Sequence, residues 1–557
     1  MKNTSLLRGF ALLSVLSLVG FVACSKKESG SAGAKSAAKS EGGIPEHKIL
    51  RWGNGTEPAG LDVHVVTGVP EHNVIAALFE GLVSENPKTL EPEPAVAESW
   101  TVENENKKFT FKIRKNAVWS NGEAITAQDV VYSWKRVLSP KLASEYAYML
   151  YVLENGEAFN KGKITDFSKV GVKAVDDHTL VVNTAGPTPY FLSLLAHYST
   201  FIVHPKTIEK FGAIDERGTK WTRPENIVSN GPFKLKEWTL NKIIKVSKSD
   251  TYWDKNKVQL EEVHYFPIDD QNAEERMFRK GKLDRTSTLP SNKIAVYREK
   301  NPEFLHIDPY LGTYYYRVNV RKPQLKDARV RKALSMAIDR QAIVEKVTKG
   351  GQIPALSFTP PNTGGYTARA AHEENVERAR QLLAEAGYPK GKGFPTTELL
   401  YNTSEGHKQI AVALQQMWKE NLGVNITLNN QDWKVYLNSN KTGNYDVARA
   451  GWIGDYNDPN TFLDMWVKDG GNNQTGWFDT QYDELIKKAS LEANPAKRLE
   501  FFQQAETILL EHAPVIPVYT YTRVYLLNPA VQGYYPNIID HHPLKYISKI
   551  ESGAAGR

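Results

Sequence analysis

Apolar side chains in the second half of the chain recur at helical spacing between short apolar runs. Residues 407–422 carry apolar side chains every three or four positions, and Gly423 follows as a helix-stop signal. The flanking runs 399–401 and 424–428 are short and apolar, as in buried strands. A strand, a helix and a strand joined by short links predict a parallel pair with a right-handed crossover.

Two further helices are predicted upstream. Apolar residues at 330, 333, 334, 337 and 338 mark one helix, which should end near Gly350 and Gly351. Residues 376–386 mark another, with Gly387 at its C-terminal cap and Pro389 just beyond. Strand patterns are found at 108–113, 179–183, 243–247, 263–267 and 517–525. The body is therefore predicted to be a mixed α/β protein with several lobes.

Residues 1–23 have the pattern of a secretory signal peptide. Lys2 and Arg8 precede an apolar run over 9–23 that is shorter than the roughly 20 residues needed to span a bilayer. The chain's only cysteine, Cys24, follows directly in a context that resembles a bacterial lipobox, although Phe21 replaces the usual Leu. We expect Cys24 to be lipidated; an ordinary signal peptide with a chance cysteine is the alternative.

Residues 24–45 are rich in Ser, Ala, Gly and Lys and contain almost no large apolar side chains. Such a segment cannot bury a core, so we expect a flexible tether between the lipid anchor and the body. These features predict a protein of the cell envelope, on the periplasmic face and anchored to a membrane by lipid.

Composition narrows the functional classes. The 557 residues allow three to four domains, and 41% hydrophobic with 24% charged residues is ordinary for a globular protein. A net charge of +7 over this length gives no nucleic-acid signature. One cysteine excludes internal disulfides and cysteine-rich metal sites.

Sequence motifs of common enzyme classes are absent. The chain contains no HExxH, GxSxG or GxxxxGK[ST], and no GxGxxG follows a strand. Adjacent carboxylates, as at 176–177 and 269–270, are more often solvated charges than acid/base pairs. We therefore expect no enzyme activity, no cofactor and no metal, although carboxylate catalysis stays open as a minor alternative.

The segment 444–459 combines chemical groups suited to binding a peptide. A strand-like run contains Arg449, Gly451 and Trp452, and Asp455 follows where the strand gives way to a loop. A peptide lying along such a strand could pair with its backbone, and the carboxylate could take its ammonium group. The alternative is a core tryptophan followed by a turn and a surface aspartate.

This segment resembles the peptide-site strand of bacterial periplasmic oligopeptide-binding proteins of dipeptide and oligopeptide ABC importers. The resemblance runs through about residues 48–550. It includes LFEGL at 78–82, VWSNGEAITAQDVVYSW at 118–134, VSNGPFKL at 228–235, DPYLGTYYYRVN at 308–319 and PVIPVYTY at 514–521. Many separate matches in the same order make chance an unlikely explanation.

The resemblance implies an α/β fold of the periplasmic-binding-protein type: a two-lobed clamshell with an additional small domain and a hinge between the lobes. Lobe I would comprise residues 46–79, 206–307 and 523–557. The additional domain would be residues 80–205, and lobe II residues 308–522. Members of this family enclose short extended peptides between the lobes, and the loaded form docks on an ABC permease.

The resemblance also assigns roles to single residues. Asp455 matches the position that pairs with the peptide α-ammonium, and Gly451, Ile453 and Val69 match positions that offer backbone groups. Arg449 and His407 match charged positions that can receive the ligand carboxylate. Four aromatic residues match positions around the ligand: Trp433, Trp452, Tyr146 and Tyr521.

Some positions depart from the family pattern. Thr67 replaces a frequent Glu, Asn440 a family Arg, and Thr348 a family Lys. The neighbouring Lys349 and Lys441 could compensate only by reaching in from positions that point elsewhere. The ammonium end of the site is therefore expected to be preserved and the carboxylate end remodelled. Gly312 and Ile453 stand where some relatives carry a disulfide.

The implied partners are short peptides, the transmembrane permease with its cytoplasmic ATPases, and a membrane through the lipid anchor. No nucleic acid is expected, and the protein should be a monomer. Three alternatives remain: the same fold with another cargo, such as a murein-derived peptide or haem; an envelope hydrolase that uses carboxylates; and a surface adhesin or chaperone-like scaffold.

Overall fold

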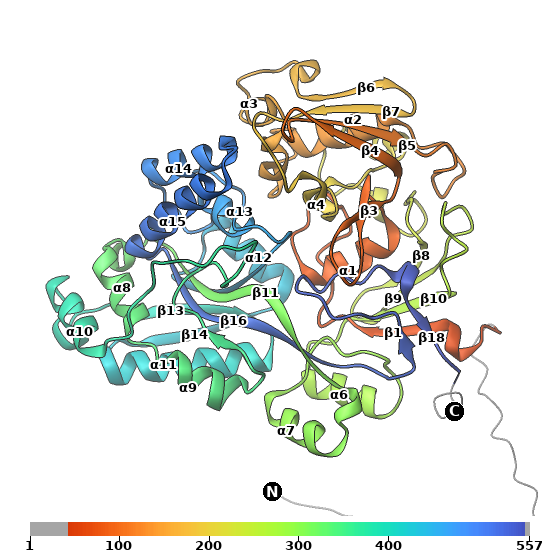
Figure 1. Cartoon of the computed structure of the whole chain (residues 1–557). Coiled ribbons are helices and arrows are strands. Elements are labelled where there is room, and N and C mark those ends of the chain that lie inside the picture. Colours follow the sequence, from red (N-terminus) through yellow and green to blue (C-terminus); the bar gives the residue numbers. More distant parts are fainter. Residues whose placement is uncertain (1–42, 552–557) are drawn as a thin grey trace, which may run out of the picture.

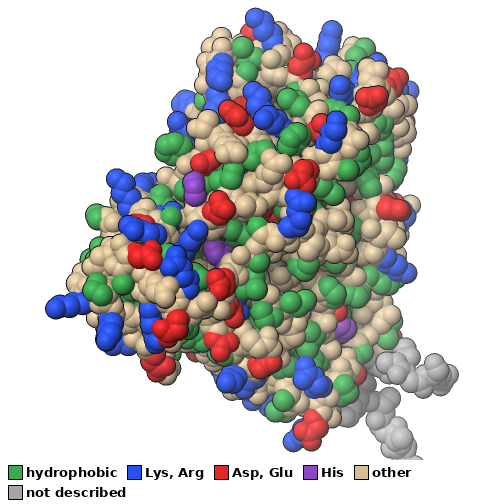
Figure 2. Space-filling model, turned by 60° about the vertical axis from the view of Figure 1, so that its left-hand side comes forward, with side chains coloured by type: hydrophobic (Ala, Val, Ile, Leu, Met, Phe, Trp, Pro, Cys, Tyr) green, Lys and Arg blue, Asp and Glu red, His purple; other side chains and the backbone are tan. Residues whose placement is uncertain are grey.

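The computed structural model describes residues 43–551 and contains three principal sheets (Figure 1). The expected signal peptide, Cys24 and most of the tether lie outside the described residues. Within 43–551, no helix combines the length and the apolar character needed to cross a membrane. On the face in Figure 2, positive and negative side chains are interspersed.

The first sheet has the strand order β1-β10-β9-β8. β1 (Ile49–Gly53) runs parallel to β10 (Glu262–Phe266), and β9 (Ile243–Lys248) is antiparallel to both β10 and β8 (Phe233–Thr239). Two helices, α6 (Gln271–Arg279) and α7 (Ser291–Lys300), follow β10. This sheet thus joins segments that lie about 200 positions apart in the sequence.

The second sheet lies in a separate layer at the top of Figure 1 and has the order β4-β5-β7-β6. Its strands are β4 (Ala97–Glu103), β5 (Lys108–Ile113), β6 (Val172–Asp176) and β7 (Thr179–Asn183). β5 alternates buried and more exposed residues, the pattern of a sheet with one packed face. The helix α2 (Ala127–Leu138) buries Val130, Trp134 and Val137.

The third sheet has six strands in the order β12-β16-β11-β15-β13-β14. They are β11 (Leu305–Val318), β12 (Ile353–Pro354), β13 (Thr397–Asn402), β14 (Ile426–Gln431), β15 (Val447–Ile453) and β16 (Val515–Leu526). One face of β11 packs against Leu334, Ile410 and Trp418, and the other against Phe358 and Trp466. Helical layers therefore cover both faces.

β11 and β16 are unusually long and connect the two lobes (Figure 1). Their ladder runs from Leu305–Leu526 to Arg317–Val515, with an irregular register between Pro309 and Thr313. The lobe boundaries expected from the sequence, 307/308 and 522/523, fall inside this ladder. A continuous pair of strands thus crosses from one lobe to the other, and its irregular step is where bending would cost fewest hydrogen bonds.

Most elements predicted from the pattern are confirmed, with shifts at their ends. The predicted helix over 407–422 is α11 (Glu405–Leu422), and β13 and β14 pair in parallel on either side of it. The helix over 376–386 is α10 (Val376–Glu385), and Gly387 has a φ of +96°. The strand predicted at 424–428 instead covers 426–431, because Gly423 and Val424 complete the turn after α11.

The prediction of one continuous helix from 330 toward Gly350 was wrong. α8 (Ala328–Met336) ends at Met336, and the Asp339 carboxylate then caps α9 (Arg340–Ala342) by accepting from the N–H of Ala342. A stretch of π-helix, Ile343–Thr348, follows. An aspartate suits an N-cap better than a helix interior, which explains the break.

Candidate functional site

A cavity of about 480 Å³ lies between the lobes, and all ten residues expected at the site line it. They come from segments that are far apart in the sequence: Val69, Tyr146, His407, Trp433, Arg449, Gly451, Trp452, Ile453, Asp455 and Tyr521. The segment 444–459 is therefore part of a cavity wall, and the alternative of a surface aspartate after a core tryptophan is wrong for Asp455, which is buried.

The edge of β15 is open where it faces the cavity. β15 pairs with β11 along its whole length, from Gly312–Ile453 to Val318–Val447. On the other side, β13 pairs only with Val447 and Ala448, so residues 449–453 have no strand partner there. A Cβ atom at Gly451 would lie 2.4 Å from the Tyr521 hydroxyl, so a glycine at this position lets Tyr521 pack against the strand. An extended chain can add to such an edge.

Asp455 lies just beyond the end of this open edge, and its side chain is 8% exposed. Its Oδ2 accepts from the Thr461 hydroxyl at 3.2 Å, and its backbone N–H donates to the same hydroxyl at 3.0 Å. Burial raises the pKa of Asp455 to about 8, because the charged form loses its hydration. The carboxylate is thus held in place without a lysine or arginine among the described residues.

His197 faces Asp455 from the other side, with Nε2 at 3.3 Å from Oδ1. The backbone N–H of Ser199 donates to Nδ1, which leaves the imidazole proton on Nε2, directed at the carboxylate. Burial holds the pKa of His197 well below its usual range, so the ring is neutral. Asp455 therefore has the Thr461 hydroxyl as a donor and a neutral imidazole beside it, but no cationic partner among the described residues. A buried carboxylate of this kind favours a ligand cation.

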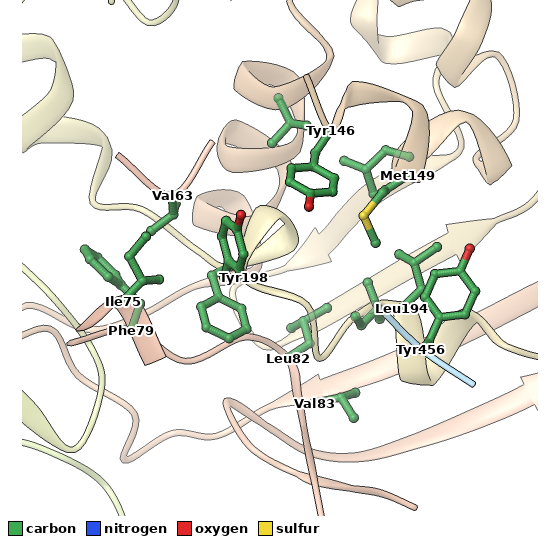
Figure 3. Packing of buried hydrophobic residues seen from close by; sticks show 14 of the residues in the cluster. Val63, Ile75, Phe79, Leu82, Val83, Tyr146, Met149, Leu194, Tyr198 and Tyr456 are labelled. Atoms are coloured by element: carbon green, nitrogen blue, oxygen red, sulfur yellow. The ribbon is translucent and has the colours of Figure 1, made fainter. Parts of the chain in front are cut away.

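Aromatic rings surround the same carboxylate. The Tyr146 ring lies 4.7 Å from the His197 ring and 6.3 Å from Trp452, between centroids. Figure 3 shows Tyr146 and Tyr198 close together in the buried cluster, with ring centroids 5.8 Å apart. The indole N–H of Trp452 is buried and has no hydrogen-bond partner within residues 43–551. These rings give the cavity rigid apolar walls with polar tips.

Arg449 lies within β15, six positions before Asp455. One guanidinium N–H donates to the Tyr521 hydroxyl at 2.8 Å and another to Oδ1 of Asn402 at 3.3 Å. The guanidinium also lies 4.7 Å above the Tyr314 ring. No carboxylate within the described part of the chain forms an ion pair with it, so Arg449 can receive an anion from a ligand.

Two further expected residues close the cavity. Val69 begins α1 (Val69–Leu78) on the first lobe, opposite β15. Trp433 begins α12 (Trp433–Thr442), and its indole N–H donates to the Glu71 carboxylate at 3.0 Å. This bond joins the lobes. Glu71 is fully buried, and burial raises its pKa.

The carboxylate end differs as the sequence indicated. Thr348 lines the cavity and donates to Gln352 at 2.8 Å, whereas Lys349 does not line it. Lys441 is bound to Glu145 at 3.0 Å, so its charge has a partner within the protein. His407 is half-buried beside Tyr314, and desolvation holds its pKa well below the usual range. It can donate a hydrogen bond as a neutral ring, but it brings no positive charge.

The sequence analysis missed His197 and Arg317, which both line the cavity. His197 stands in a stretch without any motif, and its contact with Asp455 spans more than 250 positions. Arg317 ends the run YYYR, and its alternation with the tyrosines could have placed it on one face of the strand. Nothing in the local pattern indicates that this face meets a cavity.

Comparison with known proteins agrees with this geometry. Residues 91–474 match the family described as bacterial extracellular solute-binding proteins, family 5 Middle. The chain is 41% identical over 517 residues to the periplasmic oligopeptide-binding protein OppA of Salmonella typhimurium, covering 90% of this chain and 93% of that protein. It is also 41% identical over 486 residues to the periplasmic murein peptide-binding protein MppA of Escherichia coli, with coverages of 86% and 88%.

Solved structures of two-lobed binding proteins superpose on the chain. A structure of E. coli MppA gives a TM-score of 0.86 at 39% identity, covering 91% of this chain and 99% of that one. Haemophilus influenzae OppA in complex with the peptide RPPGFSPFR gives 0.86 at 34% identity, with coverages of 91% and 100%. The unliganded open form of MppA gives only 0.61 over 91% and 98% of the chains. The lobes of this chain are thus arranged differently from that open form.

Proposed function

Because this chain belongs to the bacterial extracellular solute-binding proteins of family 5, we propose that it captures short extended peptides in the cavity between its lobes and delivers them to the permease of an ABC importer. The observation that carries the proposal is Asp455. It is a buried carboxylate without a cationic partner in the described chain, at the end of a strand edge that is open to the cavity.

The proposed binding mode follows from this arrangement. The peptide ammonium pairs with Asp455, and the peptide main chain adds to the edge formed by Gly451 and Ile453. Because the ammonium lies at the C-terminal end of β15, the peptide runs antiparallel to that strand. Its carboxylate then comes near Arg449 or, in a longer ligand, near His407.

Main-chain pairing explains how one site can accept many sequences, since every peptide offers the same backbone groups. Tyr146, Trp433, Trp452 and Tyr521 contact the side chains through flat apolar surfaces, which discriminate weakly among residues of similar size. Val69 contributes from the first lobe, so that binding requires both lobes.

The remaining assignments complete this proposal. Cys24 carries a lipid anchor, and residues 24–45 tether the body to the membrane on the periplasmic face. Lobe I comprises 46–79, 206–307 and 523–557, the additional domain 80–205, and lobe II 308–522. Relatives of this chain are periplasmic binding proteins, which supports the location.

The proposal predicts that removal of one charge at either side of the ammonium contact weakens binding strongly. Ligand-stripped wild type and Asp455→Ala should be titrated calorimetrically with tri- to pentapeptides that carry a free or an acetylated N-terminus. Each change should cost about 3 kcal/mol or more, because a buried charge loses its partner. The two changes together should cost little more than either alone.

Asp464→Asn is the matched control, because Asp464 is also a buried carboxylate but does not line the cavity. Its affinity for free-amine peptides should stay within about threefold of wild type. If stripped wild type binds no peptide, the proposal fails.

A murein-derived peptide is the second candidate cargo. The similarity to MppA and the changed carboxylate end around Thr348 and Asn440 favour it. Mass spectrometry of the ligand that co-purifies with the protein distinguishes the two, because a murein peptide contains amino acids that ordinary peptides lack.

A further inference from the structure

Arg317 is a second buried cation of the cavity, besides Arg449. It lies on β11, lines the cavity and is 8% exposed. One guanidinium N–H donates to Oδ1 of Asn440 at 3.3 Å, and Nε has no partner within residues 43–551. The other groups that interact with its charge are phenols, those of Tyr315, Tyr436 and Tyr445. All of these partners are neutral.

No carboxylate of the described chain neutralises Arg317, since none lies within ion-pair distance of it. Each carboxylate that lines the cavity is held by another group: Glu85 by His541, Glu145 by Lys441, Asp269 by Thr56, Glu274 by the backbone N–H of Ser287, Asp455 by Thr461 and Asp540 by Arg523. A guanidinium taken out of water without a counter-ion is destabilising. A ligand carboxylate would remove that cost and could bind in bidentate geometry.

The two arginines lie on opposite faces of the same strand pair. Tyr316 of β11 is the cross-strand partner of Arg449, whereas Arg317 is the partner of Ala448. Cross-strand partners share a face, so Arg449 and Arg317 point to opposite sides of the sheet. The residues beside Arg317 on its face include Ala448 and Ala450, which are both buried.

An extended peptide on the edge of β15 also sends successive side chains to alternate faces. Its terminal carboxylate can therefore meet Arg449 while a neighbouring side chain turns toward Arg317. Gln474 lines the same cavity, and its side-chain amide has an oxygen that is buried without a partner. The amide can present its NH₂ group to an anion if it is turned over.

We propose that Arg317 forms a second anion-binding subsite, which takes the carboxylate of an acidic side chain in the bound peptide. This inference rests on the proposed peptide-binding function and specifies its ligands: peptides with a free amine, a terminal carboxylate and one Asp or Glu that faces Arg317. The subsite makes the charge of that side chain, and not its size, the basis of selection.

The test is a positional scan by calorimetry with the ligand-stripped protein. Ala-Ala-Ala is compared with tripeptides and tetrapeptides that carry Glu, or the isosteric Gln, at each position in turn. At one position, wild type should bind the Glu peptide ~10-fold or more tightly than the Gln peptide, since an ion-paired hydrogen bond is replaced by a neutral one. At the other positions the two should bind alike.

Three variants locate the effect. Arg317→Gln should reduce the Glu-to-Gln ratio to within about twofold, while Arg317→Lys should keep part of the preference. Arg329→Gln, which removes the same charge from an exposed side chain outside the cavity, should keep the full ratio. Thermal unfolding shows whether each variant is folded, and the wild-type scan needs no variant.

The outcomes are distinguishable. If Ala-Ala-Ala binds but no position discriminates Glu from Gln, or if Arg317→Gln retains the discrimination, the subsite is wrong and peptide binding stands. Ala-Ala-Ala with an amidated C-terminus is also titrated, and it should bind wild type more weakly than the free acid. If Arg317→Gln abolishes this difference in affinity, Arg317 takes the terminal carboxylate and the inference is wrong. If neither neutral nor acidic peptides bind, the proposed function fails and the subsite with it.

Discussion

Asp455 shows how burial gives one side chain its role. The strand β15 brings it to the end of an open edge, Thr461 donates to one oxygen, and the neutral ring of His197 lies 3.3 Å from the other. These contacts orient the carboxylate but supply no positive charge. The closed cavity without ligand therefore favours the protonated acid, and the ligand ammonium favours the carboxylate.

Peptide binding should release a proton at mildly acidic pH. The pKa of Asp455 is raised to about 8 in the empty closed cavity, and a bound ammonium lowers it. At pH 6.5, titration in buffers of different ionisation enthalpy should show release approaching one proton per peptide. Affinity should rise by up to about tenfold per pH unit between pH 6 and 7.5. It should fall again above about pH 8, where the peptide amine loses its proton.

The same shift has the opposite sign for the stability of the empty closed form. A carboxylate whose folded pKa exceeds its unfolded value stabilises the fold at low pH, and this contribution is lost as the pH rises toward 8.

The control for proton release is Asp455→Asn, which should release no proton on ligand addition because the side chain no longer titrates. Wild type that releases none at pH 6.5 would contradict the assignment of the ammonium contact. His197 does not interfere, because its pKa lies well below this range.

At the scale of elements, the site depends on close packing between β11, β15 and β16. Gly312 of β11 faces Ile453, and its position leaves no room for a side chain: a Cβ atom there would lie 2.7 Å from the carbonyl oxygen of Trp452. The third strand closes the same space, with Tyr521 3.1 Å from that Cβ position. Close packing of the three strands thus fixes the position of the β15 edge that a peptide would contact.

Gly312→Ala should displace β15 and weaken binding. The clash with a backbone atom cannot be relieved by a rotamer change, so unfolding free energy should fall by about 1–3 kcal/mol. Peptide affinity should fall about tenfold, because the edge moves relative to Asp455. Gly60→Ala is the control, since a Cβ there meets only Val66 at 3.5 Å. Unchanged affinity in Gly312→Ala would show that the edge does not position the ligand.

At the scale of the whole molecule, the lobes meet across the cavity through polar contacts and through aromatic pairs such as Tyr146–Trp452. Trp433 donates to Glu71, Lys441 pairs with Glu145, and Gln271 donates to Ser404. Within residues 43–551, the long strands β11 and β16 run from one lobe to the other (Figure 1). Two strand crossings suit a hinge. The contacts across the cavity and whatever fills it then decide between the open and the closed arrangement.

Trp433→Phe should weaken closure. The change removes the indole N–H and leaves the buried Glu71 carboxylate with one donor fewer, which costs about 0.5–1.5 kcal/mol of the closed form. Peptide affinity should fall about threefold to tenfold, and the small-angle scattering radius with subsaturating peptide should increase. Trp238→Phe breaks a similar bond, to Glu57 at 2.6 Å, away from the cavity. It should change neither quantity; equal effects would exclude a special role for Trp433.

Local sequence determined much of this protein. Helical spacing, Gly423 and Gly387 located α11 and α10, because side-chain periodicity and a left-handed cap are properties of a few neighbouring residues. The strand segment that contains Arg449, Gly451 and Trp452, followed by Asp455, was singled out because the groups suited to a peptide lie close together in the sequence. The strand places these groups at fixed spacing wherever it packs. Resemblance along the chain supplied the residues that lie far from this strand.

Only the tertiary structure decided which charges have partners. Asp455 meets His197, Trp433 meets Glu71, and Arg317 finds only neutral groups, although hundreds of positions separate the first two pairs. Desolvation sets the pKa of Asp455, and desolvation depends on the whole surrounding fold. A sequence places a charged residue on a strand, but only packing determines whether water, a protein group or a ligand neutralises it.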